Sequence, residues 1–583
     1  MDDLRFIVQN EANLSHLSQP WVYFTDPSTN SDRGDGDIYR PLRTLSFALD
    51  RRVFGLDPFG YHLHSVLLHG LVALLFYLLL LGTLKPHARA AALGALLFVA
   101  HPLTTEAVCW ISSRADLQVA LFGLAGLIVA RKAEQSRRLL LPAALLGLMA
   151  GFGKETAVML PALYLVEHRL RAGRFRRSAL APFLSLAAGA GIYLLIYLDV
   201  RARGISGQVE FYGGSFSSHL PYGVVGVAKE LRLALWPAGM NFLWEPLMFH
   251  PLPLGSLLLA ALGLGLTAVL ACVCWRRVPG VSCGLLWFFV ALLPAANILL
   301  PLRSLLAERF AYLPLAGVAM AAAALLSRLQ GRKALLAALV LLLPLATLTW
   351  LRAGDWSTQQ RLYSSTLEQF PNSYAAHLGL GGVLLARGEA LLVAGDSDAA
   401  RPLLLDATEQ FQTARELAAD DRVPSLDATA ASGRAFLLMD DLDRAIDILA
   451  EVDLALQEDP GLAELLQRPA EARFELGTAL ARQRQLDPAR RVFLRLIQDH
   501  GRTARRLDAL GEVYRAGHDA KALEMYAQAL DIDPDYHDAR IHRALLYLQL
   551  PGFESLGRAE LREVLHRDPG NEKARKVLSE AGG

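Results

Sequence analysis

The composition of the chain changes near residue 352 from that of a membrane protein to that of a water-soluble protein. Before this point it contains a series of long, almost uncharged apolar runs, and after it we find no apolar run that reaches the ~20 residues needed to cross a bilayer. The charged residues of the first part cluster in short loops between the runs. The sequence therefore predicts an all-α protein with an extracytoplasmic loop region over 1–60, a polytopic membrane domain over 61–352 and a soluble helical domain over 353–583.

The composition agrees with this division. Hydrophobic residues make up 53% of the 583 residues, yet 20% are charged, which is typical of a chain that is half membrane protein and half soluble protein. A formal net charge of +1 argues against nucleic acid as a partner, because nucleic acid requires a basic surface. The cations are mostly Arg, and Ala, Leu and Gly are abundant, which favours a GC-rich bacterial source and a bacterial inner membrane.

Basic loops predict the orientation of the membrane domain. The basic loops near 85–89, 131–138, 169–177, 276–277 and 328–333 all fall on one side, the cytoplasm, if 218–237 is an interfacial amphipathic helix that does not cross. A buried crossing of 218–237 is the alternative. The predicted spans are 61–84, 88–104, 116–131, 138–153, 155–168, 178–199, 252–275, 281–301, 310–327 and 334–351.

Ten crossings place residues 1–60 and the C-terminal domain in the same compartment, outside the cytoplasm. The chain opens MDDLRFIV, without an apolar segment that would carry it there. We therefore expect a first membrane helix upstream of this sequence.

Polar residues gather in the segments that this topology places outside. Charged groups at membrane level are costly and are usually functional. Arg114, Lys154 and Arg309 are candidates for binding a phosphate, and Asp2 or Asp3 for taking a proton from a hydroxyl. The supporting polar residues are Tyr39, Arg40, His101, Glu106, Asp116, Glu155 and Glu308, and whether their carboxylates bind a divalent metal is left open.

Structural interpretations of the same residues stay open. Lys154 and Glu155 are also compatible with a loop at the membrane interface, and Glu308 and Arg309 with a structural ion pair. Adjacent acids at a chain start, such as Asp2 and Asp3, are usually solvated. Only the convergence of these groups on one side favours a site.

Self-similarity with a period near 34 residues predicts tetratricopeptide repeats after residue 353. The clearest units contain Leu476-Gly477 with Ala489 and Phe493, and Leu510-Gly511 with Tyr526. Small residues at these positions let two helices approach, and the aromatic side chains fill the seam. The pattern predicts an α-solenoid that binds an extended polypeptide, and it specifies no chemistry.

Taken together, these motifs resemble the transmembrane-and-tetratricopeptide-repeat family of protein O-mannosyltransferases and their bacterial relatives, which are polytopic glycosyltransferases of the C fold. The matching stretches are the acid pair with IVQN, YRPLRTLSFAL, YHLHSVLLHGL, HPLTTEAVCWISSRADL, GKETAVMLP, AERFAYLP and the repeats. Thr104 stands where relatives often have a His, and this puts its role in doubt.

The resemblance implies transfer of a sugar, mannose in this family, from a polyprenyl-phosphate-linked donor to Ser or Thr hydroxyls of extracytoplasmic proteins. It implies that the acid pair, here Asp2 and Asp3, is catalytic. The partners expected are the membrane, the lipid-linked sugar and an acceptor polypeptide bound by the repeats. Two alternatives stay open: a membrane-anchored repeat scaffold for envelope proteins without enzymatic activity, and an enzyme that moves a lipid-linked sugar onto lipid or glycan.

Overall fold

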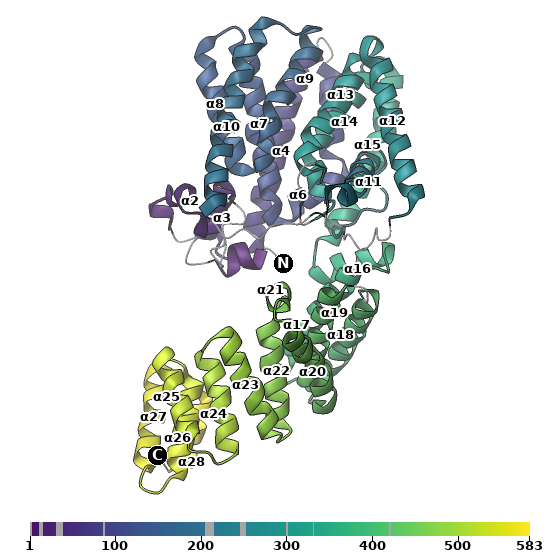
Figure 1. The fold of residues 1–583 in the computed structure, drawn as a ribbon. Coiled ribbons are helices and arrows are strands. Elements are labelled where there is room, and N and C mark those ends of the chain that lie inside the picture. Colours follow the sequence, from purple (N-terminus) through teal and green to yellow (C-terminus); the bar gives the residue numbers. More distant parts are fainter. Residues whose placement is uncertain are drawn as a thin grey trace. The chain divides into compact units, whose positions relative to one another are not determined.

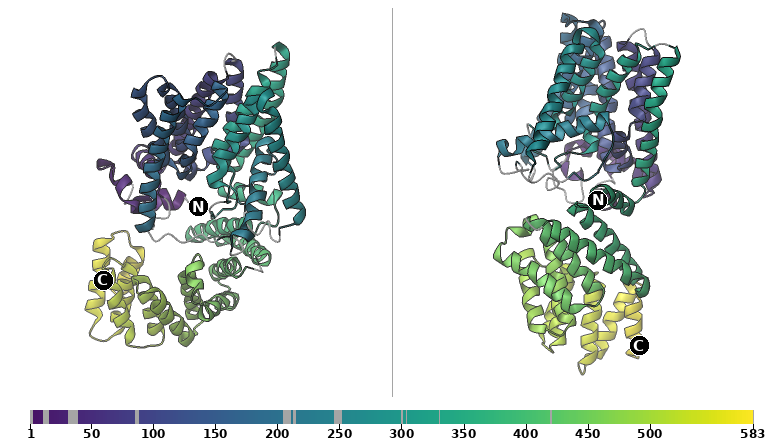
Figure 2. Two further views of the ribbon diagram at one scale, coloured as in Figure 1. Left: turned by 45° about the horizontal axis from the view of Figure 1, so that its top comes forward. Right: turned by 90° about the vertical axis from the view of Figure 1, so that its right-hand side faces the viewer.

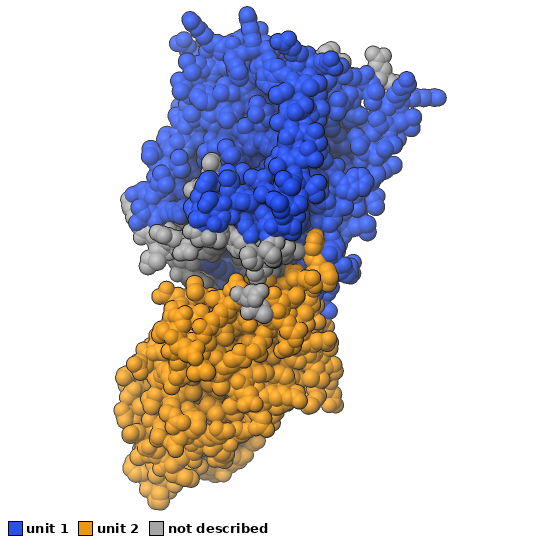
Figure 3. All heavy atoms as spheres, turned by 45° about the vertical axis from the view of Figure 1, so that its right-hand side comes forward, with its two compact units in different colours: residues 1–369 blue, residues 370–583 orange. Residues whose placement is uncertain are grey.

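The structure is a computed structural model, and it describes residues 3–10, 16–30, 39–84, 88–203, 211, 215–244, 252–298, 301–302, 304–329, 331–418 and 421–582. Over these ranges the chain is helical, and the extended pairing within them is a single bridge between Trp244 and Leu306. The chain divides into two compact units, Met1–Gln369 and Phe370–Gly583, which are coloured separately in Figure 3. The predicted all-α class is confirmed.

The first unit is an assembly of apolar helices, with short helical turns in its loops (Figure 1). Its helices are α2 Val22–Thr25, α3 Pro41–Phe54, α4 Pro58–Thr83, α5 Ala88–Val99, α6 Thr105–Cys109, α7 Arg114–Ala133, α8 Leu140–Gly153, α9 Leu160–Ala172, α10 Leu180–Arg203, α11 Phe216–Leu235, α12 Leu254–Arg277, α13 Pro279–Leu292, α14 Tyr312–Leu326, α15 Gly331–Asp355 and α16 Gln359–Gln369. The turns that carry polar residues are η1 Leu4–Val8, η4 Pro102–Thr104, η5 Ile111–Ser113, η7 Glu155–Met159 and η11 Glu308–Ala311.

Each of the ten apolar runs contains a helix. By length and composition, 7 helices among the described residues are able to cross a membrane, or up to 8 if α5 and the bent segment Pro102–Cys109 count as one span. One of the 7 is α17 Tyr374–Val393, which lies in the second unit. The expectation that no such run follows residue 352 is therefore wrong by this criterion. Hydropathy counts apolar residues but does not distinguish a helix that packs against repeat neighbours from one that faces lipid.

Small residues let α13 and α14 approach closely. A Cβ atom on Gly284 would lie 2.4 Å from the carbonyl oxygen of Gly317, and a Cβ on Gly317 would lie 2.3 Å from that of Gly284. Backbone contact of this kind is common between helices in membranes, where apolar side chains gain little from leaving lipid. The contact fixes α14 and with it the polar turn η11 directly before it.

The N-terminal segment is packed against the helices that follow it. Phe6 and Ile7 of η1 are buried in one cluster with Phe47 of α3, Tyr61 of α4 and Ile111 of η5. Because Phe6 and Ile7 follow Asp3 closely in sequence and share this cluster with Ile111, their packing holds the Asp3 backbone near η5.

The second unit is a row of helical pairs, visible in Figure 2 as the green-to-yellow part of the ribbon. Its helices are α17 Tyr374–Val393, α18 Ser397–Leu417, α19 Arg422–Leu438, α20 Leu442–Glu458, α21 Leu462–Leu465, α22 Pro469–Arg482, α23 Leu486–His500, α24 Ala504–Ala516, α25 Lys521–Ile532, α26 His537–Gln549, α27 Glu554–Arg567 and α28 Glu572–Glu580. The first helices of successive pairs contact one another: α17 with α19, α19 with α22, α22 with α24 and α24 with α26. These first helices therefore share one face of the solenoid.

In these helical pairs, a glycine of the first helix packs against a large side chain of the second, so the two helices lie close together. A Cβ on Gly477 would lie 2.8 Å from the ring of Phe493, and one on Gly511 would lie 2.6 Å from the ring of Tyr526. Both rings are buried, so the space cannot be regained by moving them toward solvent. The predicted pairing of small and aromatic residues is confirmed.

Candidate functional site

One segment, residues 110–116, contacts polar residues from several parts of the first unit. The guanidinium carbon of Arg309 lies 4.6 Å from the ring centroid of Trp110. Two residues on, the backbone N–H of Ser112 donates to Asp3 Oδ1 at 3.0 Å, and the Ser112 hydroxyl donates to the same oxygen. The segment thus links the N-terminal carboxylate to an arginine near the end of the membrane domain. Asp2, the other half of the predicted acid pair, lies outside the described residues.

Two ion pairs continue from the end of this segment. Asp116 Oδ1 lies 2.6 Å from Lys154 Nζ, and the side chains are 9% and 5% exposed. Arg40 forms a fork with Glu155, with Nη2 to Oε1 at 2.7 Å and Nε to Oε2 at 3.3 Å. Two parallel bonds of this kind fix both position and orientation. Lys154 Nζ also lies 5.2 Å from the centroid of the Phe310 ring.

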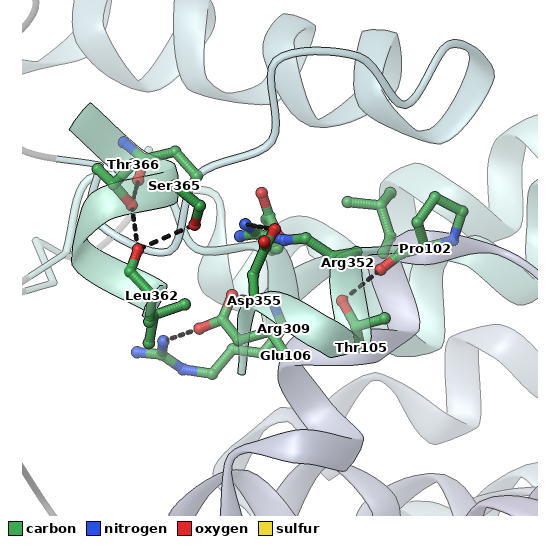
Figure 4. A network of polar contacts seen from close by, with 12 residues as sticks. Pro102, Thr105, Glu106, Arg309, Arg352, Asp355, Leu362, Ser365 and Thr366 are labelled. Carbon is green, nitrogen blue, oxygen red and sulfur yellow. Dashed lines mark hydrogen bonds and ion pairs between the residues drawn. The ribbon is translucent and has the colours of Figure 1, made fainter. Parts of the chain in front are cut away.

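The Phe310 ring joins these pairs to a second polar group, part of which is drawn in Figure 4. Glu106, with 0% of its side chain exposed, accepts hydrogen bonds from Arg309 Nη1 and, at 3.0 Å, from the Arg309 backbone N–H. Glu308 Oε2 lies 3.3 Å from Arg352 Nη2. The adjacent residues Glu308 and Arg309 therefore have different ionic partners.

Arg114 is enclosed at the start of α7. Its side chain is 0% exposed, and Nη1 lies 2.6 Å from Asp50 Oδ2. The guanidinium also donates to the Ser46 hydroxyl at 3.1 Å and to the Tyr61 carbonyl at 2.9 Å. Asp3 acts on Arg114 electrostatically, so the two charges are neighbours. Arg114 thus has no exposed surface at which a ligand would contact its side chain.

Tyr39 and His101 hold the loops around the site. The buried Tyr39 hydroxyl donates to the Phe24 carbonyl at 2.6 Å, and burial raises the pKa of Tyr39 to about 12. His101 Nδ1 accepts from the Leu103 N–H at 3.2 Å, which leaves Nε2 to donate to the Ala234 carbonyl at 3.2 Å. His101 therefore caps η4 and ties it to α11.

Glu230 of α11 is a buried acid that sequence inspection did not select for the site. It is 3% exposed, and burial, followed by the neighbouring carboxylates of Glu308 and Glu106, raises its pKa well above the usual value. Burial therefore disfavours the ionised form of Glu230. Asp50 and Arg352, the partners of Arg114 and Glu308, were also missed. For Glu230 and Arg352, a charge within or at the end of an apolar run was the available signal.

A metal site is not apparent from the side chains described. Within those ranges, no group of three or more His, Cys, Asp or Glu side chains is arranged to hold a metal ion. The arrangement instead separates carboxylates and cations into pairs around Trp110, Ser112 and Phe310. It offers a carboxylate at Asp3 and partly exposed guanidinium groups at Arg40 and Arg309, each 19% exposed.

The first unit has the apolar helices of a membrane protein, and the second has the paired helices of a tetratricopeptide-repeat solenoid. No family model matches the chain. Among curated proteins, it is 26% identical over 411 residues to the protein O-mannosyl-transferase F38B6.6 of Caenorhabditis elegans, covering 66% of this chain and 56% of that protein. It is 27% identical over 455 residues to the protein O-mannosyl-transferase TMTC4 of Mus musculus, covering 66% of this chain and 61% of that protein.

A shorter stretch is more similar. Over 129 residues, 22% of this chain and 15% of the relative, it is 40% identical to the protein O-mannosyl-transferase tmtc2 of Xenopus laevis. The chain is thus similar to TMTC and related protein O-mannosyl-transferases over about two thirds of its length, and it spans less than two thirds of the two longer matches.

Solved structures with similarity to the chain are repeat proteins. They include YrrB, described as a TPR protein with an unusual peptide-binding site, at 16% identity and a TM-score of 0.27, covering 37% of this chain and 97% of YrrB. The Cut9-Hcn1 assembly matches at 16% identity and a TM-score of 0.29, covering 86% of this chain and 95% of that one.

Proposed function

We propose that this protein is a membrane glycosyltransferase that moves a sugar, mannose in view of its relatives, from a polyprenyl-phosphate-linked donor to Ser or Thr hydroxyls of extracytoplasmic polypeptides. The observation that supports this most is the contact pattern of residues 110–116, which connects a carboxylate, Asp3, to the cations Arg309 and Lys154. A transferase of this type needs a base and a cationic site for the leaving phosphate, close to one another.

The carboxylate pair acts as the base. The acceptor oxygen attacks the anomeric carbon, and its proton passes to Asp3 or to Asp2. The two hydrogen bonds from Ser112 hold one carboxylate oxygen of Asp3, Oδ1, and so fix the position of this carboxylate next to η5.

The cations act on the leaving group. The bond between the anomeric carbon and the phosphate oxygen breaks, and its electron pair goes to the polyprenyl phosphate. Arg309 and Lys154, which each lie 5.2 Å from the centroid of the Phe310 ring, stabilise the charge that develops there. The partly exposed Arg40 fork contributes a third cation. Since the donor is already a lipid phosphate, no nucleotide-binding domain is needed.

Arg114 acts on the reaction through its neighbours. Because its side chain is 0% exposed, its charge reaches the phosphate only through space, and its main effect is to hold the start of α7 against Asp50. Tyr39, His101 and Glu106 likewise position the loops through their hydrogen bonds. Glu308 interacts electrostatically with the neighbouring carboxylate of Glu106.

The repeats bind the acceptor polypeptide and raise its concentration near the membrane domain. This requires the repeats and the site to share the extracytoplasmic side, as the basic loops predict. Cysteine labelling of intact cells at Leu454 and Leu494, two exposed positions in the repeats, tests this arrangement, and labelling only after lysis would contradict it.

The transfer itself is tested with the full-length protein in liposomes, a mannosyl polyprenyl phosphate and a Ser/Thr peptide. We expect Asp3→Asn to lower the rate at least ~100-fold, the lower range for loss of a general base. Asp57→Asn is the matched control, because Asp57 is exposed and Asn caps α4 as well as Asp does. Undiminished transfer by a variant lacking both Asp2 and Asp3 would exclude this mechanism, and absence of transfer to any peptide by the wild type would favour the scaffold or glycan alternatives.

A further inference from the structure

A pocket of about 260 Å³ lies within the repeat unit, where α17, α19 and α22 meet. Apolar side chains form part of its lining, including Leu378, Leu385 and Phe411. The volume is below the ~300–1,000 Å³ of sites for drug-sized ligands, so the pocket suits one side chain better than a larger molecule. Most of its lining comes from first helices of the pairs, which share one face of the solenoid.

The polar part of the lining is a chain of charges. Arg434 Nη2 donates to both oxygens of Glu389, at 2.9 and 2.8 Å, and Arg434 Nη1 lies 3.3 Å from Glu475 Oε1. On the same side of the pocket, Asp427 Oδ1 accepts from the Gln467 N–H at 3.0 Å. One arginine is thus shared by two carboxylates, and Asp427 is held by a neutral donor.

Carboxylates exceed cations in this lining. Four acids, Glu389, Asp427, Glu471 and Glu475, face two bases, Arg434 and Arg468. Arg505, which is not part of the lining, pairs with Glu471 at 3.0 Å, and one carboxylate is still in excess when it is counted.

Burial makes this excess costly. It raises the pKa of Glu475 to about 7, although Arg434 and Arg468 lower it, and it also raises the pKa of Asp427. The charged groups that act on Glu475 are Arg434 of α19, Arg468 and Glu471 beside it, and Arg505 of α24. A ligand cation in the pocket would supply the charge that these carboxylates lack.

We propose that this pocket binds the side chain of a Lys or Arg residue in an extended polypeptide that lies along the first helices of the repeats. The aliphatic stem packs on Leu378 and Leu385, and the cationic head lies between Asp427 and Glu475. The binding is independent of sugar transfer. Identifying the polypeptide as the acceptor rests on the proposed function.

The probe is a pool of 11-residue peptides with randomised flanks and one fixed central residue. Pools with Arg, Lys, citrulline, norleucine or Glu at the centre are passed over immobilised full-length protein, and retained peptide is measured by mass spectrometry. Randomised flanks remove the dependence on any one sequence, and citrulline has the shape of arginine without its charge. We expect the Arg and Lys pools to be retained at least fivefold better than the other three. Equal retention of Arg and citrulline would overturn the proposal.

Variants test the residues. Glu475→Gln and Asp427→Asn keep side-chain shape and should each reduce the preference for the Arg pool several-fold. Glu451→Gln is the control, because Glu451 pairs with Arg415 at 2.8 Å and is not part of the lining. If one pocket variant fails to fold, the other still tests the proposal. A preference for Arg that survives in every folded pocket variant would refute it.

The pH dependence gives an independent signature. A bound cation favours ionised Glu475, so retention of the Arg pool should rise ~tenfold between pH 6 and pH 8 and level off above, as linkage to a pKa of about 7 requires. Glu475→Gln should remove this rise. Retention that does not change with pH in the wild type would contradict the role of Glu475.

The transfer assay separates the two proposals. Peptides that bind through Arg or Lys but receive no sugar would leave the pocket assignment standing and would count against the transferase. Transfer that does not depend on a basic residue, together with equal retention of all pools, would support the transferase and would overturn the pocket assignment.

Discussion

Two adjacent glycines of α17 should respond to the same substitution with opposite signs. A Cβ on Gly381 would lie 2.6, 2.8 and 3.1 Å from three ring carbons of Phe411, whereas a Cβ on Gly382 would have no heavy atom within 4 Å. Replacing Gly by Ala in a helix interior gains up to ~1 kcal/mol from propensity alone. At Gly382 that gain is the whole effect.

At Gly381 the overlap outweighs the gain. Carbon atoms in favourable contact are ~3.5–4.0 Å apart, so the added methyl must displace the ring. Phe411 is 1% exposed and is packed against Leu404 and Ala407, so it cannot rotate into solvent. Overpacking of this kind costs ~1–3 kcal/mol. The net effect of Gly381→Ala is therefore a loss of up to ~2 kcal/mol.

Hydrogen exchange on the full-length protein measures both effects locally. A change of ~1.4 kcal/mol is tenfold in an opening equilibrium, so protection of the α17 and α18 amides should fall by up to ~30-fold for Gly381→Ala. For Gly382→Ala it should rise ~2–5-fold. Changes of the same sign at both positions would show that the Phe411 seam is not packed as described.

Three further predictions follow from charged residues. Arg309→Lys should weaken donor binding ~10-fold and leave stability unchanged in thermal unfolding, because Lys keeps the charge beside Glu106. Arg114→Gln should instead lower stability by ~3 kcal/mol, because it removes the cation from a buried pair. Similar effects of the two variants in both assays would contradict these roles. Glu475 has a folded pKa of about 7, above its value of 4.5 in the unfolded chain, so its contribution to stability is present below pH 4.5 and is lost as pH rises through 7. Protection of the backbone amides of the repeat unit against hydrogen exchange should fall between pH 4.5 and pH 7, and this decrease should be smaller in Glu475→Gln. Arg40→Lys should raise the KM for the donor several-fold because Lys cannot form the fork, and an unchanged KM would exclude Arg40 from the phosphate site.

The periodic features of the fold were accessible from the sequence. Apolar runs predicted the helices, and the spacing of Gly477 and Phe493 predicted a close helical pair, because both signals are local and repeat along the chain. Hydropathy alone does not classify α17, which is long and apolar enough to cross a membrane, because composition does not reveal what a helix packs against. Its partner α18 is amphipathic, and the two together form one repeat.

The pairing of the site charges was not accessible in this way. Glu308 and Arg309 are neighbours in sequence, but they point to different partners, Arg352 and Glu106. The partner of Arg114 is Asp50, an acid in α3 that no motif distinguishes from other surface acids. Such pairs depend on how distant helices pack, and a single sequence contains no direct record of that packing. Asp3 and Ser112 show the same limit, since their contact joins the N-terminal segment to a distant turn.

The pairing also constrains how the proposed donor would bind. Each candidate cation already has a carboxylate: Arg309 has Glu106, Lys154 has Asp116 and Arg40 has Glu155. An unpaired charge at membrane depth is costly, so each of these cations needs a carboxylate partner before the donor binds. A phosphate would therefore bind by sharing a guanidinium with its carboxylate and not by filling a bare positive pocket. Arg309 and Arg40 have the surface to do so, at 19% exposed each, whereas Lys154 at 5% acts mainly through its charge. Because the cations stay paired, they bind the singly charged donor less strongly than the leaving phosphate, which gains a second charge as its bond to the sugar breaks. This difference is the property that transition-state stabilisation requires.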